Sequence, residues 1–296
     1  HITDLILDLR GNSGGYLDQA IKILNEFFSN GELLVYTEGH ARSMEKYRAN
    51  FFGIYKNGGL CVLIDGASAS ASEIIAGAIQ DHERGIIVGE KSFGKGLVQE
   101  QIPLADGSLI RLTVSRYYTP LGRCIQKPYS YDEDIYLNHQ STTNINIDTL
   151  QQFFTKSGKT VYGGGGITPD EIIDGDDEML PGSLLYLYTS DFFNDLAFEY
   201  VDLKRGQLDN VNFNNFNISD LDQQIIFEKI HKWVLEELSE IYLKGDLKED
   251  LKKGKTTIIN RMTALIIRQY WGWGEMQMFL NESDEIIARS LYLLKK

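Results

Sequence analysis

Residues 60–78 read Leu60-Cys-Val-Leu-Ile-Asp-Gly-Ala-Ser-Ala-Ser-Ala-Ser-Glu-Ile-Ile-Ala-Gly-Ala78. The opening apolar run is typical of a buried strand, and the small residues after it lead into a segment typical of a helix that begins near Ser72. A strand, a short turn and a helix in this order indicate an α/β fold. A serine at such a junction lies beside the unpaired N–H groups of the helix N-terminus. The stretch therefore predicts a fold class and a candidate nucleophile together.

The sequence around this stretch divides into two parts. Up to about residue 175, short β-like runs alternate with glycines, as in Gly85-Ile-Ile-Val-Gly and Leu109-Ile-Arg-Leu-Thr-Val. From residue 176 apolar residues recur at intervals of three and four, which predicts helices over 184–201, 223–243, 256–270 and 282–294. We expect an α/β core over 1–175, with a polar surface insertion near 127–162, and a mainly α-helical region over 176–296. The lysine-rich stretch 244–255 is predicted to be a solvated helix end or loop.

Composition excludes several classes of protein. The 296 residues include 29 Lys and Arg against 42 Asp and Glu, a net charge of −13, which argues against a nucleic-acid-binding surface. The two cysteines, Cys61 and Cys124, allow one disulfide at most and supply no metal-ligand spacing. No apolar run approaches the roughly 20 residues that cross a bilayer. We therefore expect no metal, no cofactor and no membrane span in this chain.

Two motifs between residues 89 and 96 are rejected. The run Gly89-Glu-Lys-Ser-Phe-Gly-Lys-Gly96 matches a phosphate-binding loop except at its last position, where glycine replaces the Ser or Thr that holds magnesium. The segment after it leads toward a hairpin rather than into a helix, so nucleotide binding is not predicted. Ser92 and Lys95 match a Ser-x-x-Lys motif, but its partner motifs are absent and the glycines around Lys95 disfavour a helical turn.

The three alternating serines, Ser68, Ser70 and Ser72, have two readings. They can be turn and N-cap residues, as such serines usually are. Alternatively, one of them is a nucleophile that needs a base. None of the five histidines pairs with a recognisable nucleophile motif, whereas Lys95 lies between two glycines where the chain can approach closely and desolvate the amine. A desolvated amine gives up its proton more easily, which favours a Ser-Lys pair.

Four blocks in this order resemble the carboxyl-terminal processing peptidases, also called tail-specific proteases. The resemblance covers roughly residues 4 to 172, and each block alone is moderately specific. The blocks are Leu7-Asp-Leu-Arg-Gly-Asn-Ser-Gly-Gly15, Ser68-Ala-Ser-Ala-Ser-Glu-Ile74, Gly89-Glu-Lys-Ser-Phe-Gly-Lys-Gly-Leu-Val-Gln99, and Tyr117-Tyr-Thr-Pro-Leu-Gly-Arg123 with the later Gly165-Gly-Ile-Thr-Pro-Asp170.

The resemblance implies a role for each matched site residue. The nucleophile falls on Ser70, the general base on Lys95, and the glutamine that holds the lysine amine on Gln99. The oxyanion donors fall on the N–H groups of Ala71 and of Gly15, chosen from the Gly14-Gly15 pair. A supporting acidic position falls on Asp81, although a charged helix residue is often structural. We expect Ser68 and Ser72 to point away from Lys95.

The same resemblance implies a crotonase-like core and a serine endopeptidase that cleaves protein substrates near their C-termini, with protein or peptide substrates as its partners. It also implies an extracytoplasmic location in the bacterial periplasm or envelope. Relatives usually carry a PDZ domain and further strands before the first block, and we expect both to be missing from this sequence. Two alternatives stay open: a catalytically inactive relative that binds peptides or acts as a scaffold, and a crotonase-type acyl-CoA enzyme.

Overall fold

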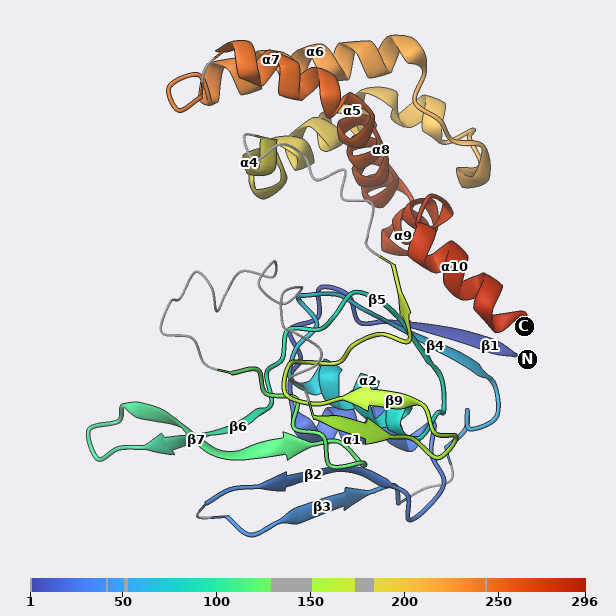
Figure 1. The fold of residues 1–296 in the computed structure, drawn as a ribbon. Helices are drawn as coiled ribbons and strands as arrows, with labels where there is room; N and C mark the ends of the chain where they lie inside the picture. The colour runs from blue at the N-terminus through green and yellow to red at the C-terminus, as the bar shows by residue number, and fades with distance from the viewer. Residues whose placement is uncertain (1, 41, 51–52, 129–150, 174–183, 243) are drawn as a thin grey trace. The chain divides into compact units, whose positions relative to one another are not determined.

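The computed structural model describes residues 2–40, 42–50, 53–128, 151–173, 184–242 and 244–296 (Figure 1). The chain forms two compact units, which are described separately. The first unit consists of His1–Gly175 together with Arg289–Lys296, and the second of Asp176–Ala288. The first unit is mixed α/β and the second is helical, as the sequence predicted.

A parallel sheet forms the centre of the first unit, with strand order β1-β4-β5-β10. Its strands are Asp4–Asp8, Gly59–Ile64, Ile86–Gly89 and Glu171–Ile172. Strand β4 is apolar from Leu60 to Ile64 because neighbours cover both of its faces, which is the usual environment of a parallel strand.

Helices α1 (Leu17–Asn25) and α2 (Ala71–Asp81) cover one face of this sheet. Val62 and Ile64 of β4 pack there in the main hydrophobic core, with Leu24 of α1 and Ile75 of α2.

The last residues of the chain cover other side chains of the sheet. Within helix α10 (Glu285–Leu294), the carbonyl of Ser290 accepts a contact of 3.8 Å from the Cys61 thiol of β4. Arg289 pairs with Glu171 of β10 at 2.5 Å. Residues 289–296 therefore group with the α/β unit, and the predicted helix there is present as α10, which ends at Leu294.

A second sheet is antiparallel, with strand order β3-β2-β7-β6. Its strands are Glu45–Arg48, Leu33–Glu38, Leu109–Tyr118 and Leu97–Pro103. Strands β6 and β7 form the hairpin predicted around Ala105-Asp-Gly, and it extends away from the core (Figure 1).

A short hairpin follows the undescribed residues 129–150, on which most of the predicted insertion falls. It consists of β8 (Gln152–Phe154) and β9 (Thr160–Tyr162). The Thr155 hydroxyl donates to Glu83 at 2.8 Å, just beyond the end of α2. Lys159 pairs with Asp170 at 2.7 Å. These bonds fix the hairpin to the α/β core.

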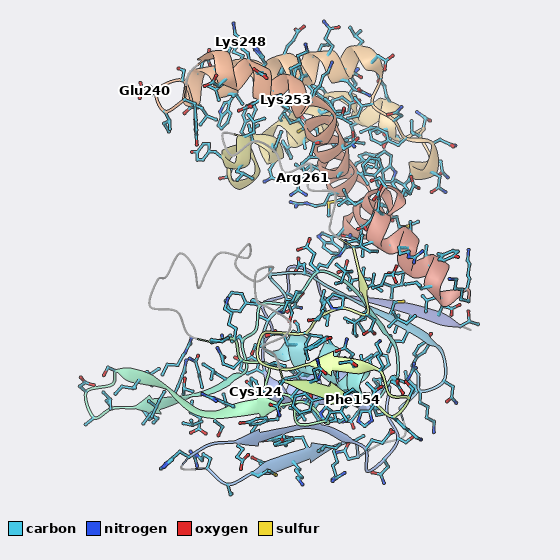
Figure 2. All side chains as sticks on the ribbon, viewed as in Figure 1. Cys124, Phe154, Glu240, Lys248, Lys253 and Arg261 are labelled. Atoms are coloured by element: carbon cyan, nitrogen blue, oxygen red, sulfur yellow. The ribbon has the colours of Figure 1, made fainter. Side chains whose placement is uncertain are left out.

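The helical unit has its own core of buried aliphatic side chains. Its described elements are α4 (Leu185–Thr189), α5 (Phe192–Leu208), a 3-10 turn (Phe213–Asn215), α6 (Asp220–Glu237), α7 (Lys244–Lys253), α8 (Lys255–Tyr270) and α9 (Trp273–Glu282). The lysine-rich stretch is thus a helix, because Leu247 and Leu251 are buried at helical spacing while Lys248 and Lys253 remain exposed (Figure 2). No helix of the described residues combines the length and hydropathy needed to cross a bilayer.

Candidate active site

Ser70 lies in the turn between β4 and α2 and is the N-cap residue of α2. Its side chain is buried, with 7% exposure, and its φ of 55° is one of two positive values at non-glycine residues in the described part of the chain. Such a backbone conformation costs about 1–3 kcal/mol and is found mainly at functional sites. The turn therefore holds Ser70 in a geometry that the serine alone would not prefer.

The two neighbouring serines are engaged elsewhere, as expected. The Ser68 hydroxyl donates to the carbonyl of Leu9 at 2.7 Å, and the Ser72 hydroxyl donates to the carbonyl of Asn12 at 2.9 Å. Both bonds reach the loop between β1 and α1. Ser70 alone is left with a hydroxyl that is not committed to this loop.

Gly14, the neighbour of the predicted donor Gly15, lies against Ala71, the other predicted donor. Gly14 has a φ of +95°, and a Cβ added there would stand 2.7 Å from the Ala71 nitrogen. The Gly14 N–H is used, because it donates to Asn12 Oδ1 at 2.9 Å. Within the described residues, the N–H groups of Gly15 and Ala71 have no acceptor. Two unpaired donors beside Ser70 are the arrangement that stabilises an oxyanion.

Lys95 occupies the loop between β5 and β6, and its side chain is half-buried. The glycines on either side allow the close approach that the sequence predicted. A Cβ on Gly94 would lie 3.0 Å from Lys127 Cβ, and one on Gly96 would lie 2.6 Å from the Gln126 nitrogen. The Lys95 backbone is thus held against residues 126 and 127.

The side chains of Ser70, Lys95 and Gln99 are not hydrogen-bonded to one another in the described part of the chain. Ser70 instead contacts Tyr117 of β7. Burial raises the pKa of Tyr117, and a hydrogen bond with the Ser70 side chain opposes that rise. Gln99 lies on β6 beside a bulge and is exposed. The Ser70–Lys95 dyad and the role of Gln99 remain predictions.

Glu73 was missed by the sequence analysis. Its carboxylate is fully buried and accepts hydrogen bonds from the Ser70 N–H at 2.8 Å, the Ser92 hydroxyl at 2.5 Å, the Gly94 N–H at 2.7 Å and the Lys95 N–H at 2.8 Å. Burial raises the pKa of Glu73, and these donors oppose the rise. A serine followed three residues later by Glu is the capping-box pattern, a signal that could have identified this residue.

Asp81 lies at the other end of α2, about 17 Å from Ser70 at 1.5 Å per residue. It forms an ion pair of 2.5 Å with Arg123, and both side chains are 1% exposed. It also accepts the N–H of Leu121 at 2.8 Å. The nearby His82 ring contacts the carbonyl of Leu33 at 2.7 Å. These contacts give both residues a structural role far from the serine.

A second lysine lies beside the Lys95 loop. Lys127 is 6% exposed, and its ammonium stands 3.8 Å from the centre of the Phe93 ring. Burial lowers the pKa of Lys127, and the Glu73 carboxylate opposes this change.

In the described part of the chain, no group of three or more His, Cys, Asp or Glu residues is arranged to hold a metal ion.

The N-terminal part of the chain, which contains Ser70 and Lys95, is similar to known peptidases. The model of "Peptidase family S41" matches residues 1–137. A "Carboxy-terminal-processing protease" of Bartonella bacilliformis is 48% identical over 122 residues, which cover 41% of this chain and 28% of that protein. A chloroplastic "C-terminal processing peptidase" of Tetradesmus obliquus is 38% identical over 126 residues, 43% of this chain and 27% of that protein. The solved "photosystem II D1 C-terminal processing protease" shares 30% identity and a TM-score of 0.44, covering 61% of this chain and 36% of that one.

The α/β unit, with a strained serine at a helix N-terminus beside free backbone donors, has the features of a serine hydrolase. The chain is similar to peptidase family S41 over residues 1–137, and the relatives that it matches are named as carboxy-terminal processing peptidases. It spans little more than a quarter of the length of the curated relatives that it matches, 28% and 27%.

Proposed function

We propose that this protein is a serine endopeptidase that cleaves protein substrates near their C-termini. The observation that carries the proposal is the position of Ser70, which is strained and buried at the start of α2 beside the unpaired N–H groups of Ala71 and Gly15. A nucleophile and an oxyanion hole are the two parts that acyl transfer requires.

Lys95 is the proposed general base. The neutral amine takes the proton from Ser70 Oγ, which attacks the carbonyl carbon of the scissile peptide bond. The oxyanion of the tetrahedral intermediate accepts hydrogen bonds from the Ala71 and Gly15 N–H groups. The ammonium of Lys95 then gives its proton to the leaving amine, the acyl-enzyme forms, and water releases it by the same steps.

Gln99 is proposed to orient the Lys95 amine once substrate is bound. A neutral amide can do so without stabilising the ammonium form, which a carboxylate at this position would favour. The exposed position of Gln99 and the Ser70–Tyr117 contact mean that these side chains must move for the dyad to form. Catalytic hydrogen bonds often tighten only in the substrate complex.

Two alternatives are less well supported. A catalytically inactive relative would bind peptides without needing Ser70 or Lys95, yet both are present. We also propose a crotonase-like core for the α/β unit of this chain. A crotonase-type acyl-CoA enzyme could have the same core and an oxyanion hole of the same kind. A Ser-Lys pair favours the peptidase over both alternatives. We propose an extracytoplasmic location for this peptidase.

The test uses the whole protein that contains this chain, with the Ser70→Ala variant as its partner. Each is incubated with an unfolded protein that has an apolar C-terminus, and the products are identified by mass spectrometry. We expect the parent to shorten the substrate at its C-terminal end and Ser70→Ala to leave it intact. Cleavage by both proteins would rule out Ser70 as the nucleophile.

A further inference from the structure

The two serines beside Ser70 join the two loops that carry the oxyanion donors. The Ser68 hydroxyl donates to Leu9 at 2.7 Å, at the start of the β1–α1 loop. The Ser72 hydroxyl donates to Asn12 at 2.9 Å, further along the same loop. Ser68 and Ser72 are 0% and 2% exposed, so water does not compete for these bonds.

The Asn12 end of this connection controls where the loop turns. The Asn12 carbonyl also accepts the Ala69 N–H at 3.1 Å, and Asn12 Oδ1 accepts the Gly14 N–H at 2.9 Å. These bonds consume the Gly14 donor and leave the next N–H, that of Gly15, without an acceptor among the described residues. Ser72 thus holds Asn12, the residue whose side chain accepts the Gly14 N–H and leaves the Gly15 N–H without an acceptor among the described residues.

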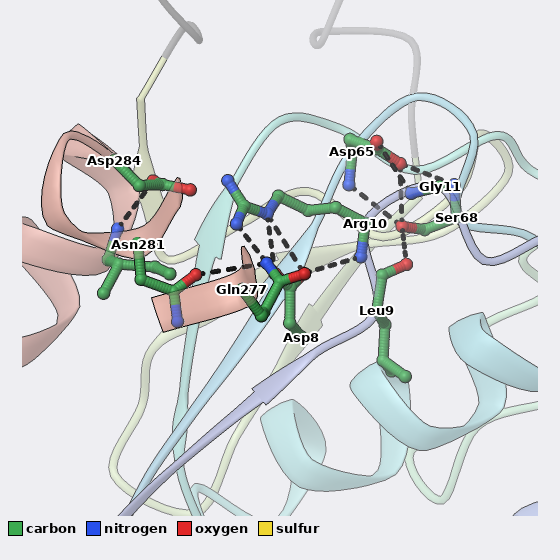
Figure 3. A network of polar contacts seen from close by, with 10 residues as sticks. Asp8, Leu9, Arg10, Gly11, Asp65, Ser68, Gln277, Asn281 and Asp284 are labelled. Atoms are coloured by element: carbon green, nitrogen blue, oxygen red, sulfur yellow. Dashed lines mark hydrogen bonds and ion pairs between the residues drawn. The ribbon is translucent and has the colours of Figure 1, made fainter. Parts of the chain in front are cut away.

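The other end is reinforced by Asp65 (Figure 3). Its Oδ2 accepts the Gly11 N–H at 2.9 Å, and its Oδ1 accepts the Ser68 N–H at 2.9 Å. One carboxylate therefore contacts both loops. The ionised acceptor makes these bonds stronger than bonds between neutral groups.

We propose that Ser68 and Ser72 are positioning residues that hold the Gly15 and Ala71 N–H groups at the separation an oxyanion needs. The inference rests on the proposed function for its consequence in catalysis. The proposal gives the serines of the Ser68-Ala-Ser-Ala-Ser72 stretch different roles. The outer serines fasten the β1–α1 loop, and the middle serine performs the chemistry.

The variants are Ser72→Ala, which removes the hydroxyl, and Ser72→Thr, which retains one. Thr263→Val is the matched control, because Thr263 makes a buried hydroxyl bond of the same kind, 2.8 Å to the Ile259 carbonyl, in the helical unit. Two measurements are made on the whole protein: amide hydrogen exchange over residues 10–16, and kcat and KM for a peptide substrate.

For Ser72→Ala we expect exchange over 10–16 to accelerate at least about 10-fold, because the loop loses a fastening bond. The value of kcat should fall about 10- to 100-fold with KM within about twofold, since deletion of a whole oxyanion donor costs about 100- to 1,000-fold. Ser72→Thr should recover most of both losses, and Thr263→Val should show neither.

Unchanged exchange over residues 10–16 in Ser72→Ala would overturn the proposal, whether or not the parent cleaves peptides. A kcat within about twofold of the parent would also overturn it, since an oxyanion donor left out of place lowers kcat. A parent without any peptidase activity would refute the proposed function, and the exchange measurement would still decide whether the loop is fastened by Ser72.

Discussion

Glu73 Oε2 accepts a hydrogen bond of 2.8 Å from the backbone N–H of Lys95. The same oxygen accepts the Ser70 N–H at 2.8 Å, so one buried carboxylate holds the backbones of the proposed nucleophile and the proposed base. The two segments are far apart along the sequence and meet at this group. Their relative position therefore depends on Glu73.

Replacing Glu73 by glutamine should disrupt this junction. Four donors point at the carboxylate, and the amide NH2 of Gln would face at least one of them without accepting its proton. Loss of such buried bonds should lower the free energy of unfolding by about 2–4 kcal/mol and remove most activity. Urea unfolding and peptide cleavage measure the two effects.

Glu83→Gln is the control, because Glu83 is an exposed carboxylate near the opposite end of α2 that also accepts several hydrogen bonds. Because this carboxylate is solvent-exposed, its replacement should leave the urea midpoint close to that of the parent. Equal unfolding midpoints for Glu73→Gln and the parent would show that Glu73 does not hold the junction.

Cys61 should be an unreactive thiol at pH 8. Burial raises its pKa from 9.0 to about 11, so little thiolate forms at that pH. Between pH 9 and 11 the unfolded thiol ionises while the folded one stays protonated. Stability should therefore fall as the pH rises through this range, and Cys61→Ala should lose that part of the slope. Thiol titration and urea unfolding from pH 8 to 11 check both statements.

Removal of residues 289–296 should expose Cys61, because Ser290 lies against its thiol. In a Cys124→Ser background, which removes the half-exposed second thiol, we expect a disulfide reagent to label Cys61 at least about 10-fold faster after the deletion. Labelling rates that do not change would mean that this segment does not protect the sheet.

Asp81 should matter for folding and little for chemistry. Asp81→Asn leaves the buried Arg123 without its partner charge, which should cost about 3–5 kcal/mol. Asp81→Leu combined with Arg123→Met should recover much of that loss. In all folded variants kcat should stay within about threefold of the parent, as the separation of about 17 Å from Ser70 implies. A fully stable Asp81→Asn protein without activity would restore a catalytic role for this residue.

Local residue patterns in the sequence predict the elements whose formation depends on residues near one another in the chain. The apolar run from Leu60 and the small residues after it are sufficient to indicate β4, the turn and α2. The lysine-rich stretch has more charged than apolar residues, which predicts a solvated helix end or loop, while its helix depends on Leu247 and Leu251 packing into the helical core.

Tertiary contacts explain what the sequence could not show. The capping-box spacing indicates the contact of Glu73 with Ser70, whereas Ser92, Gly94 and Lys95 reach Glu73 only in the fold. In the same way, nothing local in the last helix indicates that Arg289 and Ser290 pack on the parallel sheet.

The most direct test of the Ser-Lys assignment compares the rate of peptide cleavage by the parent, Lys95→Arg and His82→Ala at the same pH. A base must lose its proton, and arginine keeps its charge at every working pH. We predict that Lys95→Arg has less than about 1% of the parent activity and that His82→Ala keeps most of it. Near-parent activity in Lys95→Arg together with an inactive His82→Ala would contradict the account and assign the base to histidine.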